Sequence, residues 1–174
     1  NDEQSAFVKK YFSEKVLPTL VPIMIETAPA FPYLRDKSIY FAVKISKKAE
    51  GNKSAKFALI QIPTEILPRF VVLPKKDDSR FIILLDDVIR FSLKEVFSIF
   101  DIDTAEAYTI KLTRDAELEF DNDLSKGISE KIEKSLKQRK KGKPVRLVYD
   151  SAMPADLLHF ITKKMKMKKS GNLI

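Results

Sequence analysis

The sequence contains no cysteine, so disulfide bonds and thiolate metal sites are excluded. No apolar run approaches the ~18–20 residues that a membrane-spanning helix needs. The polar opening NDEQSAFVKKYF is unlike a signal peptide. These absences favour a cytoplasmic protein, or one held peripherally at a membrane, without a transmembrane segment.

Glycine is scarce. The chain has four glycines, Gly51, Gly127, Gly142 and Gly171, and no two of them are close in sequence. Neither a P-loop nor a dinucleotide-binding fingerprint can be built from glycines so placed, because both need several within one short turn. The sequence therefore lacks the usual phosphate cradles of nucleotide-binding enzymes.

The chain also has only one histidine, His159. On a helix over 154–166 it falls on the side of Thr162 and Lys163, away from the apolar side chains, so we expect it to face solvent. The spacing suggests no serine–histidine–acid arrangement. We therefore predict no catalytic residue in this chain.

A metal site is not expected either. Asp121, Asp123 and Ser125 alternate as in a calcium-binding EF-hand loop. However, Lys126 stands where that loop needs glycine and Ile132 where it needs glutamate. We interpret this segment as an acidic helix start, and Asp77/Asp78 and Asp86/Asp87 as a turn and another helix start.

The 174 residues are 44% hydrophobic and 32% charged, which is typical of one globular domain over residues 1–174. The hydrophobic periods predict helices over 3–16, 86–100, 122–141 and 154–166, with an extended segment over 17–25. They predict strands over 38–46, 56–62, 70–74, 80–85, 105–113 and 144–150. This order predicts an α+β fold, with a mixed β-sheet of about five to six strands covered by helices.

The positive charge is local. Residues 1–136 hold 21 Lys/Arg against 22 Asp/Glu, whereas residues 137–174 hold 11 against two. The stretch KQRKKGKPVR, residues 137–146, resembles a polyanion site, but Gly142 and Pro144 stop a helix there, and cations suit its last turn. We interpret it mainly as a helix stop. An independent basic polyanion- or nucleic-acid-binding module stays open as an alternative, although no named nucleic-acid motif is present.

Five segments occur in a characteristic order: YFSEKVLPTLVPI, FALIQIPTEILPRFVVLP, FIILLDDVIRFSLKEVF, AYTIKLTRDAELEFD and SLKQRKKGKPVRLVYDSAMP. Together they resemble the middle, or head, domain of bacterial polyphosphate kinase, the type that phosphorylates itself on histidine. The resemblance runs from about Phe7 to Leu173. It implies that the chain is a fragment of a longer multidomain protein, which the missing initiator methionine also suggests.

The resemblance further implies the activity of the parent enzyme. Such enzymes reversibly transfer the γ-phosphate of ATP to polyphosphate through a phosphohistidine, with Mg²⁺. Their phosphorylated histidine and metal-linked arginines lie in other domains, so we expect this fragment to be inactive alone and to hold no cofactor. The expected partners are the other domains of the same chain, a homo-oligomer and polyphosphate, with no specific nucleic acid. The middle domain of the family supports oligomer assembly and the walls of the polyphosphate path.

Arg69 in LPRF and Arg114 in LTRDAE are the candidates for the polyphosphate path. Each stands beside a predicted strand end or turn, and the planar guanidinium suits phosphate. The competing interpretation is a structural ion pair, for instance of Arg114 with Asp115 or Glu117, and we favour it on the sequence alone.

Overall fold

The computed structural model describes residues 1–49, 52–114 and 144–167. The helical elements are α1 (Asp2–Tyr11), the π-helical turn η1 (Phe12–Val16), the 3₁₀ turn η2 (Leu17–Thr19), α2 (Leu85–Phe91), α3 (Leu93–Val96) and α5 (Ala155–Lys164). The strands are β1 (Ile23–Met24), β2 (Ile39–Ala49), β3 (Asn52–Gln61), β4 (Phe70–Val72), β5 (Ile82–Leu84), β6 (Thr104–Arg114) and β7 (Pro144–Tyr149). The helix predicted over 122–141 and its stop lie outside the described residues.

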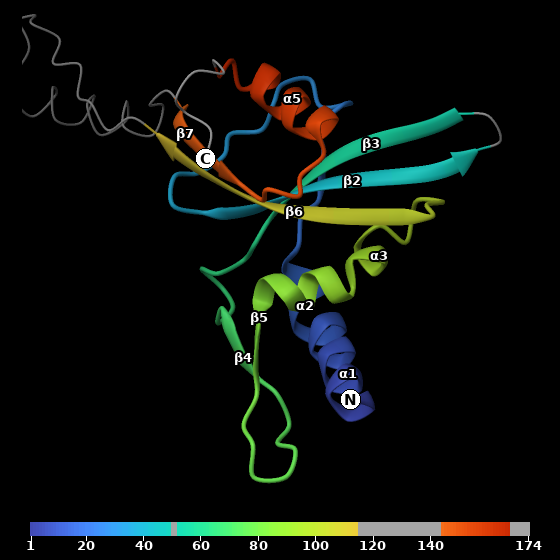
Figure 1. The fold of residues 1–174 in the computed structure, drawn as a ribbon, viewed down its shortest axis with the longest axis vertical. Coiled ribbons are helices and arrows are strands. Elements are labelled where there is room, and N and C mark those ends of the chain that lie inside the picture. The colour runs from blue at the N-terminus through green and yellow to red at the C-terminus, as the bar shows by residue number, and fades with distance from the viewer. Residues whose placement is uncertain (50–51, 115–143, 168–174) are drawn as a thin grey trace, which may run out of the picture.

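The main sheet has five strands in the order β1-β3-β2-β6-β7, which confirms the predicted α+β fold and sheet size. Every described pairing in it is antiparallel, so the strand directions are more uniform than the mixed sheet we expected. The strands predicted over 70–74 and 80–85 do not join it. They become β4 and β5, which pair only with each other in a separate two-stranded ribbon (Figure 1).

Strand β2 separates two hydrophobic cores. Ile39, Phe41 and Val43 point to one side, where they pack with α1, η1, α2 and α3. Tyr40 and Ala42 point to the other side and pack with α5. Figure 1 shows α5 on one face of the sheet and α1 to α3 on the opposite face. A strand covered on both faces needs apolar side chains at every position, which explains the continuous run IYFAV.

The β2–β3 hairpin is longer than predicted. Its ladder continues from Tyr40↔Gln61 to Ala49↔Asn52, beyond the apolar residues that indicated the strands. Backbone hydrogen bonds of an antiparallel ladder do not depend on side-chain polarity, so pairing extends into the polar segment.

The N-terminal helix also runs further than predicted. Asn1 caps it by accepting a hydrogen bond from the Gln4 N–H at 2.9 Å. Helical turns then continue through η1 and η2 to Thr19, although Pro18 was expected to end the helix. Pro18 stands at the start of the 3₁₀ turn, where the missing N–H of proline removes no hydrogen bond. The prediction of extended chain over 17–25 is therefore wrong before Leu20.

The helix predicted over 86–100 is two short helices. It breaks at Ser92, whose φ and ψ are −110° and 21°, and α3 ends at Val96. Serine is a weak helix former, and the break lets Ile89, Leu93 and Phe97 all reach the core. Asp86 and Asp87 lie in the first turn of α2, as expected for a helix start, and Leu84 occupies the N-cap position.

Helix α5 is held to the sheet by an ion pair. The Nζ of Lys44 on β2 donates to Oδ2 of Asp156, in the first turn of α5, at 2.6 Å. This hydrogen bond, helped by the Leu157 N–H and partly opposed by burial, lowers the pKa of Asp156 below its ordinary value of 3.8. The Asp156 side chain is 53% exposed, so we expect only a surface-type contribution of about 0.2–1 kcal/mol.

Replacing Asp156 by Asn should lower the free energy of unfolding by about 0.5 kcal/mol at pH 7, because the amide loses the charge attraction to Lys44. A lowered native pKa gives stability that is complete above the ordinary value of 3.8 and is lost as pH falls below it. Urea unfolding should therefore separate the two proteins at pH 7 and much less at pH 3. Asp78→Asn, on the exposed turn of the ribbon, is the matched control. An equal gap at both pH values would contradict this account.

Candidate functional site

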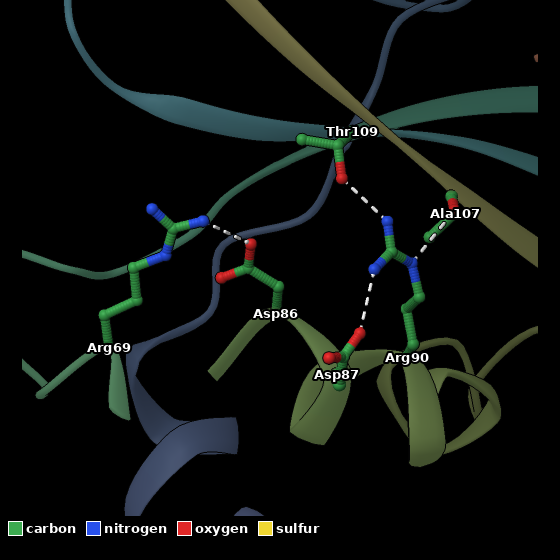
Figure 2. Close-up of polar contacts among 6 residues, drawn as sticks. All are labelled: Arg69, Asp86, Asp87, Arg90, Ala107 and Thr109. Carbon is green, nitrogen blue, oxygen red and sulfur yellow. Dashed lines mark hydrogen bonds and ion pairs between the residues drawn. The ribbon is translucent and has the colours of Figure 1, made fainter. Parts of the chain in front are cut away.

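Arg69, the first predicted path residue, connects the ribbon to helix α2. It directly precedes β4, and its carbonyl oxygen accepts a hydrogen bond from the Leu85 N–H at 2.8 Å. Its Nη2 donates to Oδ2 of Asp86 at 3.2 Å, as Figure 2 shows. The Arg69 side chain is 43% exposed, whereas that of Asp86 is 7% exposed. One end of the pair is therefore inside the protein and the other reaches solvent.

Asp86 gives this pair a structural role. Its second carboxylate oxygen, Oδ1, is buried and makes no hydrogen bond in the described structure. A buried carboxylate is costly without a cation, and removing one partner of such a pair is more damaging than replacing both. Arg69 thus neutralises a charge that the fold has already buried.

Arg90, which we did not select from the sequence, has a denser set of contacts than Arg69. From α2 it donates to Oδ1 of Asp87 at 3.0 Å, to the carbonyl of Ala107 at 3.3 Å and to Oγ1 of Thr109 at 2.7 Å (Figure 2). Its Cζ also lies 4.6 Å from the centre of the Phe41 ring. These contacts lock α2 to β6. The only sequence signal was the acid–base spacing of Asp87 and Arg90, which is common on exposed helices.

Arg114, the second predicted residue, ends β6 and holds the segment before β2. Its Nε donates to the Leu34 carbonyl at 2.9 Å, and its Cζ lies 4.2 Å from the centre of the Tyr33 ring. Its backbone N–H donates to Oδ1 of Asp36 at 3.4 Å. The suggested partners Asp115 and Glu117 lie outside the described residues. Arg114 therefore has a packing role that does not depend on them.

Two cavities in the described part of the chain do not include Arg69 or Arg114. A cavity of about 250 Å³ lies beside β1 and is mainly apolar, with Val21, Tyr33, Tyr40 and Ile66 among its lining residues. A second, of about 260 Å³, is lined by Lys47, Lys56 and Asp101 among others. Neither arginine lines either cavity. Whether the two residues contact polyphosphate stays a prediction.

His159 is exposed on α5, as its helical spacing predicted. Across the described ranges, no group of three or more His, Asp or Glu side chains could hold a metal ion. The helices in those ranges are also too short or too polar to cross a membrane.

Comparison with known proteins identifies the fold and the family. The family model described as the polyphosphate kinase middle domain matches residues 3–173. The chain belongs to this family. In the crystal structure of the polyphosphate kinase from Porphyromonas gingivalis, a similar fold covers all of this chain, with a TM-score of 0.74 and 26% identity.

The curated relatives are also polyphosphate kinases. That of Vibrio cholerae is 40% identical and covers 98% of this chain, and that of Escherichia coli K12 is 32% identical over the same share. The match covers only 24% of the Vibrio cholerae protein and 25% of the Escherichia coli protein. The polyphosphate kinase middle domain thus spans about a quarter of the length of the relatives it matches.

A mutant cycle tests the structural role of Arg69 in this polyphosphate kinase domain. Arg69→Ala should lower the free energy of unfolding by about 1–3 kcal/mol, because it leaves the Asp86 carboxylate buried without its cation. The same change in an Asp86→Asn background should cost less by at least about 0.5 kcal/mol, since no buried charge remains.

Thermal or urea unfolding of the four proteins measures this coupling. Arg80→Ala, at an exposed position beside the ribbon, is the control and should change stability by less than about 0.5 kcal/mol. If Arg69→Ala is as mild as Arg80→Ala, the structural role is wrong and Arg69 is free for another function.

Proposed function

We propose that this chain is the non-catalytic middle domain of a polyphosphate kinase, one domain of a longer cytoplasmic protein. The full-length enzyme reversibly transfers the γ-phosphate of ATP to polyphosphate through a phosphohistidine, using Mg²⁺. The match of the middle-domain family model to residues 3–173 carries this proposal. About three quarters of each relative's length lies outside the match, which leaves room for catalytic domains there.

The chemistry of the described residues favours a structural role beside the catalytic domains rather than a catalytic one. Phosphoryl transfer depends on positioning a nucleophile and on metal ions or arginines that neutralise the developing charge. The single histidine is exposed on α5, and Arg69 and Arg90 are engaged with acids of α2. The two arginines hold the fold together, whereas a catalytic centre needs its charged groups aimed at a bound substrate.

The β4–β5 ribbon supports the proposed role in oligomer assembly. Its outer face exposes 62% of Phe70, 65% of Val72 and 64% of Ile82. Val71 and Ile83 of the same strands instead face the core. An apolar face of this kind is unusual on a surface that stays in water. The turn beyond it carries both signs of charge, in KKDDSR, which suits contact with a second copy of the same surface.

The alternative, an independent polyanion- or nucleic-acid-binding module, rests on the basic residues 137–174. The family match across nearly the whole chain favours a domain that works within a larger enzyme.

The proposed lack of activity can be tested directly. The 174-residue chain, incubated with γ-labelled ATP and Mg²⁺, should incorporate no stable label, because His159 is exposed on α5 and phosphoryl transfer needs a nucleophile positioned against a bound, charge-neutralised phosphate. The full-length enzyme is the positive control and should become labelled. Acid-labile phosphate on this chain that disappears in His159→Ala would contradict the proposal.

The proposed oligomer contact predicts a change of assembly state. In the full-length enzyme, Val72→Lys with Ile82→Lys should shift the oligomer toward monomer, because the two cations would be desolvated against a copy of themselves. Sedimentation velocity measures the shift. Ile99→Lys is the matched control, since Ile99 is 87% exposed and lies outside the ribbon. An unchanged oligomer in the ribbon variant would place the contact elsewhere.

A further inference from the structure

Two cations lie together on one face of the sheet where β6 meets β7. Lys111 pairs with Val148 across the ladder, and Thr113 pairs with Arg146. The alternate residues Ile110, Leu112 and Leu147 are buried in the core that α5 covers. Because neighbours along a strand point to opposite faces, Lys111, Thr113 and Arg146 project from the other face. We call these three residues the basic sheet face.

The basic sheet face is open to solvent. Lys111, Thr113 and Arg146 are all exposed. Helix α2, which covers this side of the sheet further along, reaches β6 through Arg90 at Ala107 and Thr109. Lys111 is the next residue of β6 on the same face as Thr109, so the open region begins where the contacts of Arg90 end.

The charges of the basic sheet face have no counter-ion among the described residues. Neither the Lys111 side chain nor the Arg146 side chain makes a hydrogen bond or an ion pair to any of them. This differs from Lys44, Lys47 and Arg90, each of which bonds an aspartate. Lys111 and Arg146 occupy diagonal positions of an antiparallel pair, which are about 7–8 Å apart. Two like charges on neighbouring strands repel each other weakly in water, and an anion bound between them would offset that repulsion.

Protection of a sheet edge explains only part of this arrangement. β7 is an edge strand of the described sheet, and charged side chains often protect such edges from pairing with another chain. That accounts for Arg146. It does not account for Lys111, because β6 lies between β2 and β7 and its edges are already paired.

We infer that the basic sheet face binds successive phosphate groups of a polyphosphate chain. This inference rests on the proposed function and assigns a phosphate contact to residues other than Arg69 and Arg114. The Arg146 fork and the Lys111 ammonium can each hold phosphate oxygens, and the Thr113 hydroxyl can donate a further hydrogen bond. Two cations several ångströms apart fit a chain of linked phosphates better than one isolated phosphate ion.

Direct binding tests this assignment. The 174-residue chain is titrated into end-labelled polyphosphate, and fluorescence anisotropy is followed across a range of KCl concentrations. Lys111→Gln with Arg146→Gln should weaken binding about tenfold at low salt. It should also reduce the magnitude of the slope of log affinity against log salt by roughly one to two units, because about two phosphate contacts are lost.

A matched variant removes the same charge elsewhere. Lys94 on α3 and Lys163 on α5 are exposed and lie outside the basic sheet face, so Lys94→Gln with Lys163→Gln should weaken binding less than about twofold. Circular dichroism and thermal unfolding confirm that all variants are folded. Equal losses in both double variants, or no binding by the unmodified chain, would overturn the assignment. Equally tight binding of single-stranded DNA would also overturn it, in favour of a general polyanion module.

The full-length enzyme separates this inference from the proposed function. There, Lys111→Gln with Arg146→Gln should raise the KM for polyphosphate several-fold and leave autophosphorylation by ATP unchanged, because this face is not assigned to the reacting phosphate. An unchanged KM would refute the basic sheet face while leaving the middle-domain proposal intact. An unmodified enzyme that makes no polyphosphate would instead refute the proposed function.

Discussion

The burial of β2 on both faces is the constraint on which the rest of the domain depends. β2 pairs with β3 on one side and with β6 on the other, so its backbone hydrogen bonds are satisfied within the sheet. Its side chains then require a cover on each face. The N-terminal helices with α2 and α3 supply one cover, and α5 supplies the other (Figure 1). Segments from both ends of the chain must therefore pack against β2 before both cores are closed.

Five cations of the described structure fall into two groups. Arg69 and Lys44 join separate elements through an acid, the ribbon to α2 and β2 to α5. Arg90 joins α2 to β6 through the Ala107 carbonyl and the Thr109 hydroxyl. Lys111 and Arg146 join nothing among the described residues. Cations of the first group stabilise the fold, and their donors are already aimed inward. Lys111 and Arg146 can therefore offer their full charge to an anion from outside without weakening a contact among the described residues.

The sequence was a good guide wherever the local pattern and the tertiary environment agree. The run IYFAV predicted β2 because a strand buried on both faces has no polar alternation, and the period of Leu157 and Ile161 predicted α5. The pattern failed where packing overrode it. Helical turns continue past Pro18, and the helix after Leu85 breaks at Ser92, because in each case the apolar residues must reach a shared core. The pairing of β4 with β5 outside the main sheet has no local signal.

The site was harder to predict for a physical reason. Arginine suits a buried aspartate for the same reason that it suits phosphate, since both accept its planar fork. Position beside a turn therefore could not distinguish Arg69 as a structural residue from Arg69 as a phosphate ligand. The structural partner of Arg69 is known only from the burial of Asp86, and burial is a property of the folded chain. Lys111 and Arg146 were not selected from the sequence because no local pattern links them. They are distant in sequence, and only the register that pairs Thr113 with Arg146 places their charges on one face. Strand register therefore places charges together that no motif along the chain would have grouped.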